Sequence, residues 1–330
     1  MKKKERAIVF TSDRGFIVPT LVAAAQIMAQ KEVIDIADIL IFLVDIDNHE
    51  SSLIKMAFPD DDIKFINMNS KNYMFGKDVH FSPTHVPPSA LARLVTGNDI
   101  PENYSNLLYL DGDIQIVGPI IDLVLFDVPE GKILAAADRS YIKAPELTNT
   151  ARRMRDYLNG IGIRDRTRYF NSGVMACTRL TWIDVGQEAF DYFLNHSKKC
   201  RYHDQSALNA VCMPRQIPLD PKYNYMSTYA ECESHGMITP CIIHFNGAEK
   251  PWFAKSRPWK GFFIDVYEKF LKQHPELEIF PLFPEKSHSE AVDLRAERNW
   301  KKLRMVTPWR LYTRRRRIRR YVNQTRLLPY

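Results

Sequence analysis

The alternation of short apolar runs with helix-like segments through the first 180 residues most constrains how this chain can fold. The short runs have the length of buried strands, and the segments between them have the length of crossover helices. The pattern predicts an α/β fold with a mostly parallel central sheet. The predicted strands are Arg6–Thr11, Ile39–Val44, Ile63–Met68, Asn106–Leu110, Ile133–Ala137 and Gly173–Cys177.

Helix signals separate these strands. Pro19 opens a stretch rich in Leu, Val and Ala that ends near Lys31, and proline is well tolerated at the first position of a helix. Ser89 precedes the sequence ALARLV and is a candidate N-cap. Residues 181–195 carry large apolar side chains at helical spacing, which predicts a third helix.

The pattern becomes irregular after Lys198, where prolines punctuate short segments. We expect this region to wrap a site and not to form a second sheet. From about Glu290 the composition shifts to an arginine-rich, helix-forming tail. The sequence thus predicts one main domain at residues 1–285 and a basic helical C-terminal extension at residues 286–330.

The positive charge of the chain is concentrated at its C-terminal end. The whole chain carries a formal charge of +7, yet residues 301–330 contain eleven Lys or Arg and no Asp or Glu, which leaves the first 300 residues at −4. Any polyanionic partner is therefore expected to bind the tail, and the main domain is not expected to bind nucleic acid.

The five cysteines are odd in number and irregularly spaced, so neither a disulfide framework nor a zinc site is predicted. Reduced thiols in a cytoplasmic protein are expected. The apolar run near the start is too short for a signal peptide. The longest aliphatic run, Ile39–Val44, is far below the roughly 20 residues of a membrane span.

The most informative motif is LYLDGD, in which an apolar strand runs into Asp111, Gly112 and Asp113. Ligands of open α/β sheets gather at the carboxyl ends of strands, and two carboxylates there can bind one hard cation. Gly112 permits close backbone approach by a ligand. The alternative is a strand followed by a solvated Asp-Gly turn.

Three further segments carry polar groups. Asn171 lies at the start of a strand, Asp204 and Gln205 open a helix, and His244, Gly247 and Lys250 follow the sequence CII. A histidine near a lysine suggests a metal ligand beside a phosphate-binding cation. Taken singly, His244 could be a core histidine, Lys250 a solvated charge and Asn171 a turn residue.

Together and in this order, the motifs resemble glycosyltransferase family 8, the retaining galactosyl- and glucosyltransferases of bacterial lipopolysaccharide assembly and their relatives. The resemblance runs from Ala7 to about Trp252 and rests most on LYLDGD and on IHFNGAEKPW, which is close to the family signature H-x-x-G-x-x-K-P-W. It implies a GT-A type nucleotide-sugar-binding fold.

The resemblance also assigns roles to residues of this chain. Asp111, Asp113 and His244 would hold a divalent cation, manganese or alternatively magnesium, on the diphosphate of a UDP-hexose. Further donor contacts are implied for Thr11, Asp13, Phe16, Arg93, Gly112, Asp138, Gly247 and Lys250. Asn171, Asp204 and Gln205 would act near the reacting carbon of the donor.

An amide, Gln205, stands where a double displacement would need a carboxylate nucleophile. We therefore expect front-face attack, in which the acceptor hydroxyl enters on the side that the diphosphate leaves. Asp204 is the alternative nucleophile. The loops at residues 73–88 and 143–168 are expected to shape the acceptor pocket.

The implied acceptors are lipid-linked oligosaccharides, so the basic, aromatic tail is expected to bind the anionic cytoplasmic face of the inner membrane peripherally. In a helix, Leu311, Ile318 and Val322 would form one narrow apolar stripe on that surface. An RNA-binding or merely solvated tail is the alternative. For the whole chain, the alternatives are a nucleotidyltransferase or an inert sugar-nucleotide-binding protein.

Overall fold

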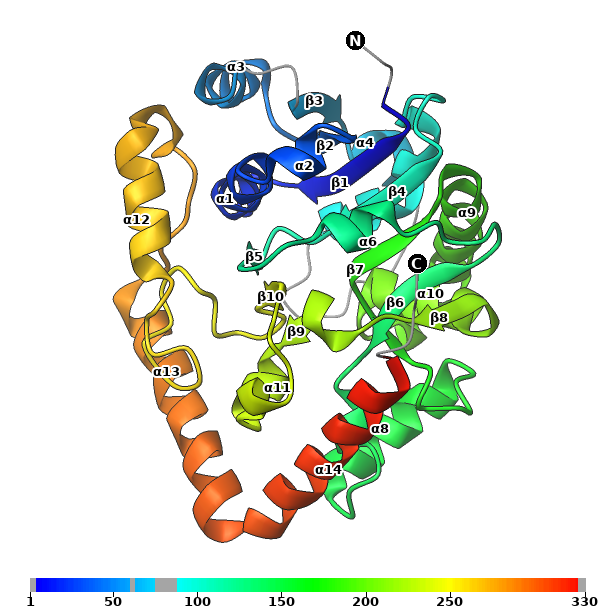
Figure 1. The fold of residues 1–330 in the computed structure, drawn as a ribbon, viewed down its shortest axis with the longest axis vertical. Coiled ribbons are helices and arrows are strands. Elements are labelled where there is room, and N and C mark those ends of the chain that lie inside the picture. Colours follow the sequence, from blue (N-terminus) through cyan, green and yellow to red (C-terminus); the bar gives the residue numbers. More distant parts are fainter. Residues whose placement is uncertain (1–3, 60–62, 75–87, 326–330) are drawn as a thin grey trace.

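A seven-stranded sheet forms the centre of the computed structural model, which describes residues 4–59, 63–74 and 88–325 (Figure 1). Its strands are β1 (Arg6–Ser12), β2 (Ala37–Val44), β3 (Ile63–Met68), β4 (Asn106–Leu110), β6 (Ile133–Ala137), β7 (Phe170–Thr178) and β8 (Gln216–Pro218). They lie in the order β3-β2-β1-β4-β7-β6-β8. Strand β7 runs antiparallel to β4 and β6, and the other neighbouring pairs are parallel. The six predicted strands and the mostly parallel sheet are confirmed.

The central strands are apolar because both faces of the sheet are covered. In β2, Ile39 and Ile41 pack into the apolar core on one face, and Leu40 and Phe42 pack into the core on the other. Every residue of β2 is buried. This alternation explains why the strand reads as a continuous hydrophobic run.

Helices cover both faces of the sheet (Figure 1). The first face carries α1 and α12, and the second carries α5, α9 and α10, whose apolar side chains complete the two cores. The helices of the main domain are α1 (Ile17–Met28), α2 (Lys31–Ile34), α3 (Asn48–Ala57), α4 (Lys71–Met74), α5 (Ala92–Val95), α6 (Ile121–Leu125), α7 (Ser140–Lys143), α8 (Asn149–Gly160), α9 (Arg179–His196), α10 (His203–Cys212), α11 (Ser227–Glu231) and α12 (Ile264–Gln273).

The expectation that the proline-rich region forms no second sheet is wrong. Strands β9 (Tyr225–Met226) and β10 (Ile242–His244) join β5 (Ile114–Ile116) in a three-stranded sheet with the order β5-β10-β9. From the same region, β8 extends the main sheet. These strands have two or three residues each, which is too short for a periodic pattern to be recognised.

The N-cap prediction for Ser89 is also wrong. Ser89 lies inside a 3-10 turn, Pro88–Leu91, that precedes the short helix α5. Its hydroxyl donates a hydrogen bond to Asp13 Oδ2 at 2.5 Å instead of capping the helix. Ser89 therefore packs at the end of β1, beside Asp13.

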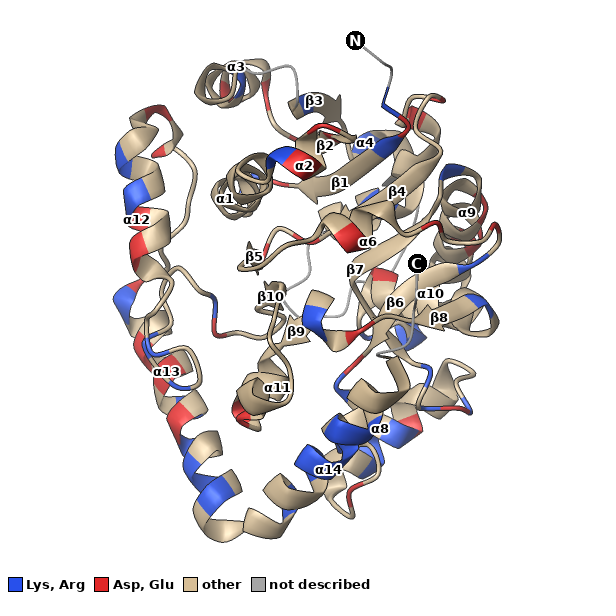
Figure 2. Cartoon of the chain, in the orientation of Figure 1, with Lys and Arg blue, Asp and Glu red and all other residues tan. Residues whose placement is uncertain are grey.

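The basic C-terminal segment is helical, as predicted. Helix α13 (Lys286–Lys301) leads through a π-helical turn at Lys302–Val306 into α14 (Pro308–Thr325). The two helices form a V along one edge of the molecule, and basic residues line its lower part (Figures 1 and 2).

The prediction of an exposed apolar stripe on this tail is wrong. Ile318 and Val322 are buried against Ile142 and Tyr225 of the main domain, and Leu311 packs beside them. The stripe forms one face of a helix, as predicted, but the protein itself covers that face. Basic side chains on the other faces of α14, such as Arg316 and Arg319, are exposed.

The five cysteines are buried and unpaired, in agreement with the sequence. No helix among the described residues combines the length and the apolar content needed to cross a bilayer.

Candidate active site

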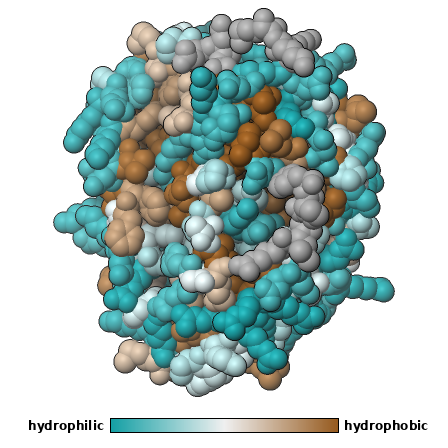
Figure 3. Space-filling model, viewed as in Figure 1, coloured by the Kyte–Doolittle hydropathy of each residue, from teal (hydrophilic) through white to brown (hydrophobic). Residues whose placement is uncertain are grey.

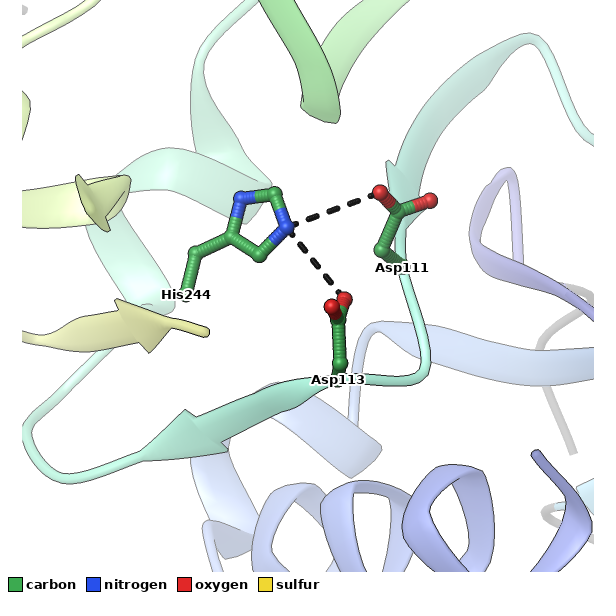
Figure 4. Close-up of side chains that lie close together, drawn as sticks. All are labelled: Asp111, Asp113 and His244. Carbon is green, nitrogen blue, oxygen red and sulfur yellow. Dashed lines mark ion pairs between the residues drawn. The ribbon is translucent and has the colours of Figure 1, made fainter. Parts of the chain in front are cut away.

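Three side chains converge where β4 ends and β5 begins (Figure 4). Asp111 and Asp113 flank the turn between these strands, and β10 pairs with β5 so that His244 lies opposite Ile114. His244 Nε2 is 3.6 Å from Asp111 Oδ2 and 3.2 Å from Asp113 Oδ1. The small second sheet thus carries the histidine to the two aspartates, which are far from it in sequence.

The donor set of this cluster fits a divalent cation. One possible ligand atom from each residue lies within 4.8 Å of the others. His244 Nδ1 is 3.0 Å from Asn224 Oδ1, an acceptor, so Nδ1 carries the proton and Nε2 keeps its lone pair for a ligand. Two carboxylates with one imidazole suit manganese or magnesium better than a soft metal.

Lys250 belongs to the same cluster. Its Nζ lies 2.5 Å from Asp113 Oδ2 and donates to the carbonyl oxygen of Phe245 at 2.9 Å. Burial alone would raise the pKa of Asp113, but the charge of Lys250 holds it well below its usual range. Asp113 therefore remains a carboxylate at neutral pH.

Gly173 of β7 has no side chain, and the cluster occupies the space that a side chain would fill. A Cβ at this position would collide with His244 Cε1 and would lie 2.6 Å from Asp111 Oδ2. Any other residue here would displace two of the three candidate ligands. The glycine of the sequence YFNSGV is thus required by the packing of the site and not by its own backbone angles.

A buried ion-pair chain supports Asp111 from the other side. Arg93 lies 2.7 Å from Asp111 Oδ1 and 3.1 Å from Asp204 Oδ2, and its guanidinium stacks over the ring of Tyr109 at 4.5 Å. Burial raises the pKa of Asp204 to about 6, against the attraction of Arg93. Through these two ion pairs, Arg93 links Asp111, a candidate metal ligand, to Asp204, the alternative nucleophile.

The amides near the expected reacting carbon form a second chain. Asn171 donates to Gln205 Oε1 at 3.1 Å and accepts from Asn224 Nδ2 at 2.9 Å. Gln205 in turn donates to the hydroxyl of Tyr169 at 3.1 Å. Because Asn224 also contacts His244, the amide chain and the metal cluster form one continuous polar network.

The residues expected to bind the nucleotide lie at the end of β1. Asp13 accepts hydrogen bonds from Ser89 and from the backbone N–H of Gly15. The ring of Phe16 lies 5.8 Å from Lys250 Nζ. Thr11 reaches the cluster through a hydrogen bond to the hydroxyl of Tyr109, which donates to Asp111 at 3.1 Å.

Three further residues are expected to contact the sugar donor, namely Gly112, Asp138 and Gly247. Gly112 is tightly packed, since a Cβ there would collide with Thr20 Oγ1 of α1. Asp138 is buried at the end of β6 and accepts from the backbone N–H of Ser140 at 3.0 Å. A Cβ at Gly247 would lie 2.8 Å from Glu249 Oε2.

Three residues that orient the candidate site were not predicted from the sequence. Asn224 orients His244, Tyr109 bonds Asp111, and Tyr169 holds Gln205. Tyr109 falls in LYLDGD, one of the motifs that carry the resemblance, whereas the sequence around Asn224 and Tyr169 gives no comparable signal. Of the expected acceptor loops, residues 75–87 lie outside the described structure, and residues 143–168 include α8.

Comparison with known proteins places this geometry in a family. A family model described as glycosyl transferase family 8 matches residues 7–256. The lipopolysaccharide 1,2-glucosyltransferase of Escherichia coli is 27% identical over 221 residues, 58% of this chain and 61% of the relative. The glycosyltransferase GlyE of Streptococcus pneumoniae is 23% identical over 309 residues, 86% of this chain and 68% of the relative.

Solved structures agree on the fold. The galactosyltransferase LgtC, in complex with donor and acceptor sugar analogues, superposes with a TM-score of 0.64 at 21% identity, covering 85% of this chain and 98% of LgtC. The GT-A type fold implied by the sequence is confirmed. The family match favours the glycosyltransferase hypothesis over a nucleotidyltransferase. This chain belongs to glycosyltransferase family 8.

Proposed function

We propose that the chain transfers a hexose, galactose or glucose, from a UDP-sugar to a hydroxyl of a lipid-linked oligosaccharide such as lipopolysaccharide, with retention of configuration. The observation that carries this proposal is the cluster of Asp111, Asp113 and His244 beside Lys250. The names of two relatives, a lipopolysaccharide glucosyltransferase and a galactosyltransferase, support the hexose and the acceptor class.

Asp111, Asp113 and His244 would hold manganese, or alternatively magnesium. When bound, such a cation supplies Lewis-acid stabilisation of the charge that develops on a departing diphosphate. Lys250 adds a positive charge at the same place. Phe16, whose ring faces Lys250, and Asp13 would hold the nucleotide on the β1 side of the cluster.

The experiment that tests this function is a panel of UDP-sugars with manganese, read as hydrolysis or as transfer to oligosaccharide acceptors. In wild-type protein we expect turnover with UDP-galactose or UDP-glucose. Asp113→Ala should abolish turnover and metal-dependent UDP binding, because it removes a ligand and leaves Lys250 unpaired. Manganese-dependent transfer retained in Asp113→Ala would refute the proposal, and an unchanged thermal transition would show that the variant is folded.

We infer front-face attack, because Gln205 is an amide and Asp204 is paired with Arg93. In this mechanism the leaving phosphate accepts the proton of the acceptor hydroxyl, and Gln205, held by Asn171 and Tyr169, contributes a fixed dipole. The test is mass spectrometry of wild-type enzyme quenched during turnover. No glycosyl adduct is expected, and an adduct on Asp204 would establish double displacement instead.

We also propose that the protein binds the cytoplasmic face of the inner membrane peripherally. Exposed apolar side chains gather at the turn between α13 and α14, where Met305, Trp309 and Tyr312 are 78%, 60% and 69% exposed. Exposed Lys301 and Arg316 lie nearby in the sequence. Aromatic and basic side chains together suit an anionic lipid surface.

A further inference from the structure

A cavity of about 570 Å³ lies between the main domain and the C-terminal helices. Helices α8 and α11 line one side of it, and α13, the π-helical turn and α14 line the other. Its volume is that of a small-molecule site. We call it the inter-helix pocket.

The inter-helix pocket adjoins the proposed diphosphate site. Ser227 and Glu249 line it, and a Cβ on Gly247 would lie 2.8 Å from Glu249 Oε2 and 3.9 Å from Ser227 Oγ. Ser227 follows Met226, which pairs with His244 across the small sheet. A molecule that fills the pocket can therefore extend to the cluster, whereas the nucleotide residues lie on the β1 side.

The lining of the pocket is strongly basic. Three acidic side chains, Glu146, Glu231 and Glu249, face six basic ones. The basic residues are Lys143, Arg257, Lys302, Arg304, Arg310 and Arg314.

Two of the three carboxylates are already neutralised. Arg314 binds Glu146 at 2.6 Å, and Lys143 lies 3.1 Å from Glu231. Among the described residues, Arg257, Lys302 and Arg310 have no carboxylate within ion-pair distance. These three cations exceed the single charge of Glu249, so the pocket attracts an anion.

Two hydrogen-bond donors that line the pocket have no partner in the described part of the chain, which also indicates an anionic ligand. Ser227 Oγ and Arg304 Nη1 are buried atoms that find no hydrogen-bond partner among the described residues, and Ser227 is only 7% exposed. Both residues line the pocket. A buried donor left unpaired costs about 1–3 kcal/mol, which a bound acceptor would remove.

The N-terminus of α8 contributes a third element. Residues 148–151 line the pocket, and the first turn of this 12-residue helix has no acidic side chain. Thr148 accepts from the backbone N–H of Ala151, while the earlier N–H groups of a helix lack intrahelical acceptors. Such a turn favours phosphate.

We propose that the inter-helix pocket binds a phosphoryl group of the acceptor glycan. The surplus of cations suits a phosphate dianion better than a carboxylate, and guanidinium groups match its geometry. This inference rests on the proposed function for the identity of its ligand. The phosphorylated sugar would lie in the pocket with its reacting hydroxyl towards the metal cluster.

The test is calorimetric titration of the full chain, saturated with UDP and magnesium so that the nucleotide site is filled. Glucose 6-phosphate is the probe, with inorganic phosphate and glucose as separate arms. We expect saturable binding of glucose 6-phosphate, weaker binding of inorganic phosphate and no detectable binding of glucose. Equal binding of glucose and glucose 6-phosphate, or no binding of either, would overturn the proposal.

Variants on α14 locate the binding. Arg310→Gln should weaken glucose 6-phosphate about tenfold and leave UDP affinity unchanged, and Arg310→Lys should restore part of the loss. Arg319→Gln is the matched control, because Arg319 lies on the same helix but outside the pocket. The proposal fails if Arg310→Gln binds the probe like wild type or if Arg319→Gln weakens it equally.

Binding to lipid vesicles distinguishes a phosphate carried by a glycan from the phosphate of a lipid headgroup. If Arg310→Gln reduces binding to phosphatidylglycerol vesicles but not to glucose 6-phosphate, the pocket serves a lipid surface and the proposal is wrong. UDP affinity and UDP-sugar hydrolysis, measured on the same samples, report on the proposed function independently of the pocket.

Discussion

At the scale of single residues, the candidate site depends on buried side chains that orient its candidate ligands. Asn224 is fully buried, accepts from His244 Nδ1 and donates to Asn171. One amide thus sets the tautomer of the candidate metal ligand and the orientation of a neighbouring polar group. Outer partners of this kind tune metal affinity.

Replacing Asn224 should therefore weaken the metal site without removing a ligand. We expect Asn224→Ala to lower manganese affinity by roughly 10- to 100-fold, the range for lost outer partners of metal-bound histidines. Asn224→Asp keeps an acceptor at Nδ1 and should retain most of the affinity. Titration with manganese, followed by calorimetry, measures both, and equal affinity of Asn224→Ala and wild type would contradict the assignment.

The candidate ligands could be predicted from sequence because they sit in spaced motifs, at Asp111, Asp113 and in H-x-x-G-x-x-K-P-W. Gly173 and Asn224 could not, because their roles exist only across the folded sheet. The space at Gly173 is defined by His244, which is 71 residues later in the numbering. No local pattern encodes that proximity.

At the scale of elements, α14 is anchored to the sheet by one hydroxyl. Tyr321 accepts from the backbone N–H of Ala137 at 2.7 Å and donates to the carbonyl oxygen of Leu219 at 2.9 Å. Burial raises the pKa of Tyr321, so the hydroxyl keeps its proton and can donate. Ala137, which Tyr321 contacts, directly precedes Asp138, one of the residues expected to bind the sugar donor.

Removing that hydroxyl leaves two buried backbone groups unsatisfied. We expect Tyr321→Phe to reduce the free energy of unfolding by about 1–3 kcal/mol, the cost of an unpaired buried polar group. Tyr312→Phe is the control, because Tyr312 is 69% exposed on the same helix. Urea denaturation measures the difference, and equal midpoints for the two variants would show that the anchor contributes no stability.

The longer elements could be predicted from sequence because apolar periodicity extends over whole strands and helices, as in β2 and α9. Strands β9 and β10 could not, since they are too short to show a period. The apolar face of α14 was visible, but sequence alone does not say whether lipid or protein covers such a face. Here Ile318 and Val322 pack against protein.

At the scale of the whole molecule, positive charge and exposed apolar side chains gather at the C-terminal helices (Figure 2). Basic residues concentrate on α14 and the adjoining end of α13 (Figure 2), and apolar side chains reach the lower edge of the face in Figure 3. Met305, Val306 and Trp309 are exposed at the turn between these helices. This arrangement supports adsorption by the turn.

The membrane proposal predicts a binding defect from exposed residues. Arg316→Gln should lower partitioning onto phosphatidylglycerol vesicles about fivefold, since one basic residue contributes about 1 kcal/mol. Trp309→Ala should also weaken binding, whereas Phe262→Ala, an exposed aromatic elsewhere, should not. Sedimentation with vesicles measures all three, and salt at 1 M should release wild type because its Debye length is roughly 3 Å.

Two results would contradict this proposal. One is vesicle binding by Arg316→Gln and Trp309→Ala that matches wild type. The other is tighter binding of the full chain to RNA than to anionic vesicles at physiological salt.

Helix α14 runs about 20 Å at the usual rise per residue from its start at Pro308, beside the exposed turn, to Tyr321, whose hydroxyl forms the anchor next to Asp138. Because the start of α14 is exposed and Tyr321 is fixed to the sheet, a bilayer held at the turn would lie at a constant height from the candidate metal cluster. The length of α14 would then determine which position along a lipid-linked glycan reaches the cluster. An acceptor hydroxyl standing at that height above the lipid would be glycosylated, and one much nearer or farther would be passed over.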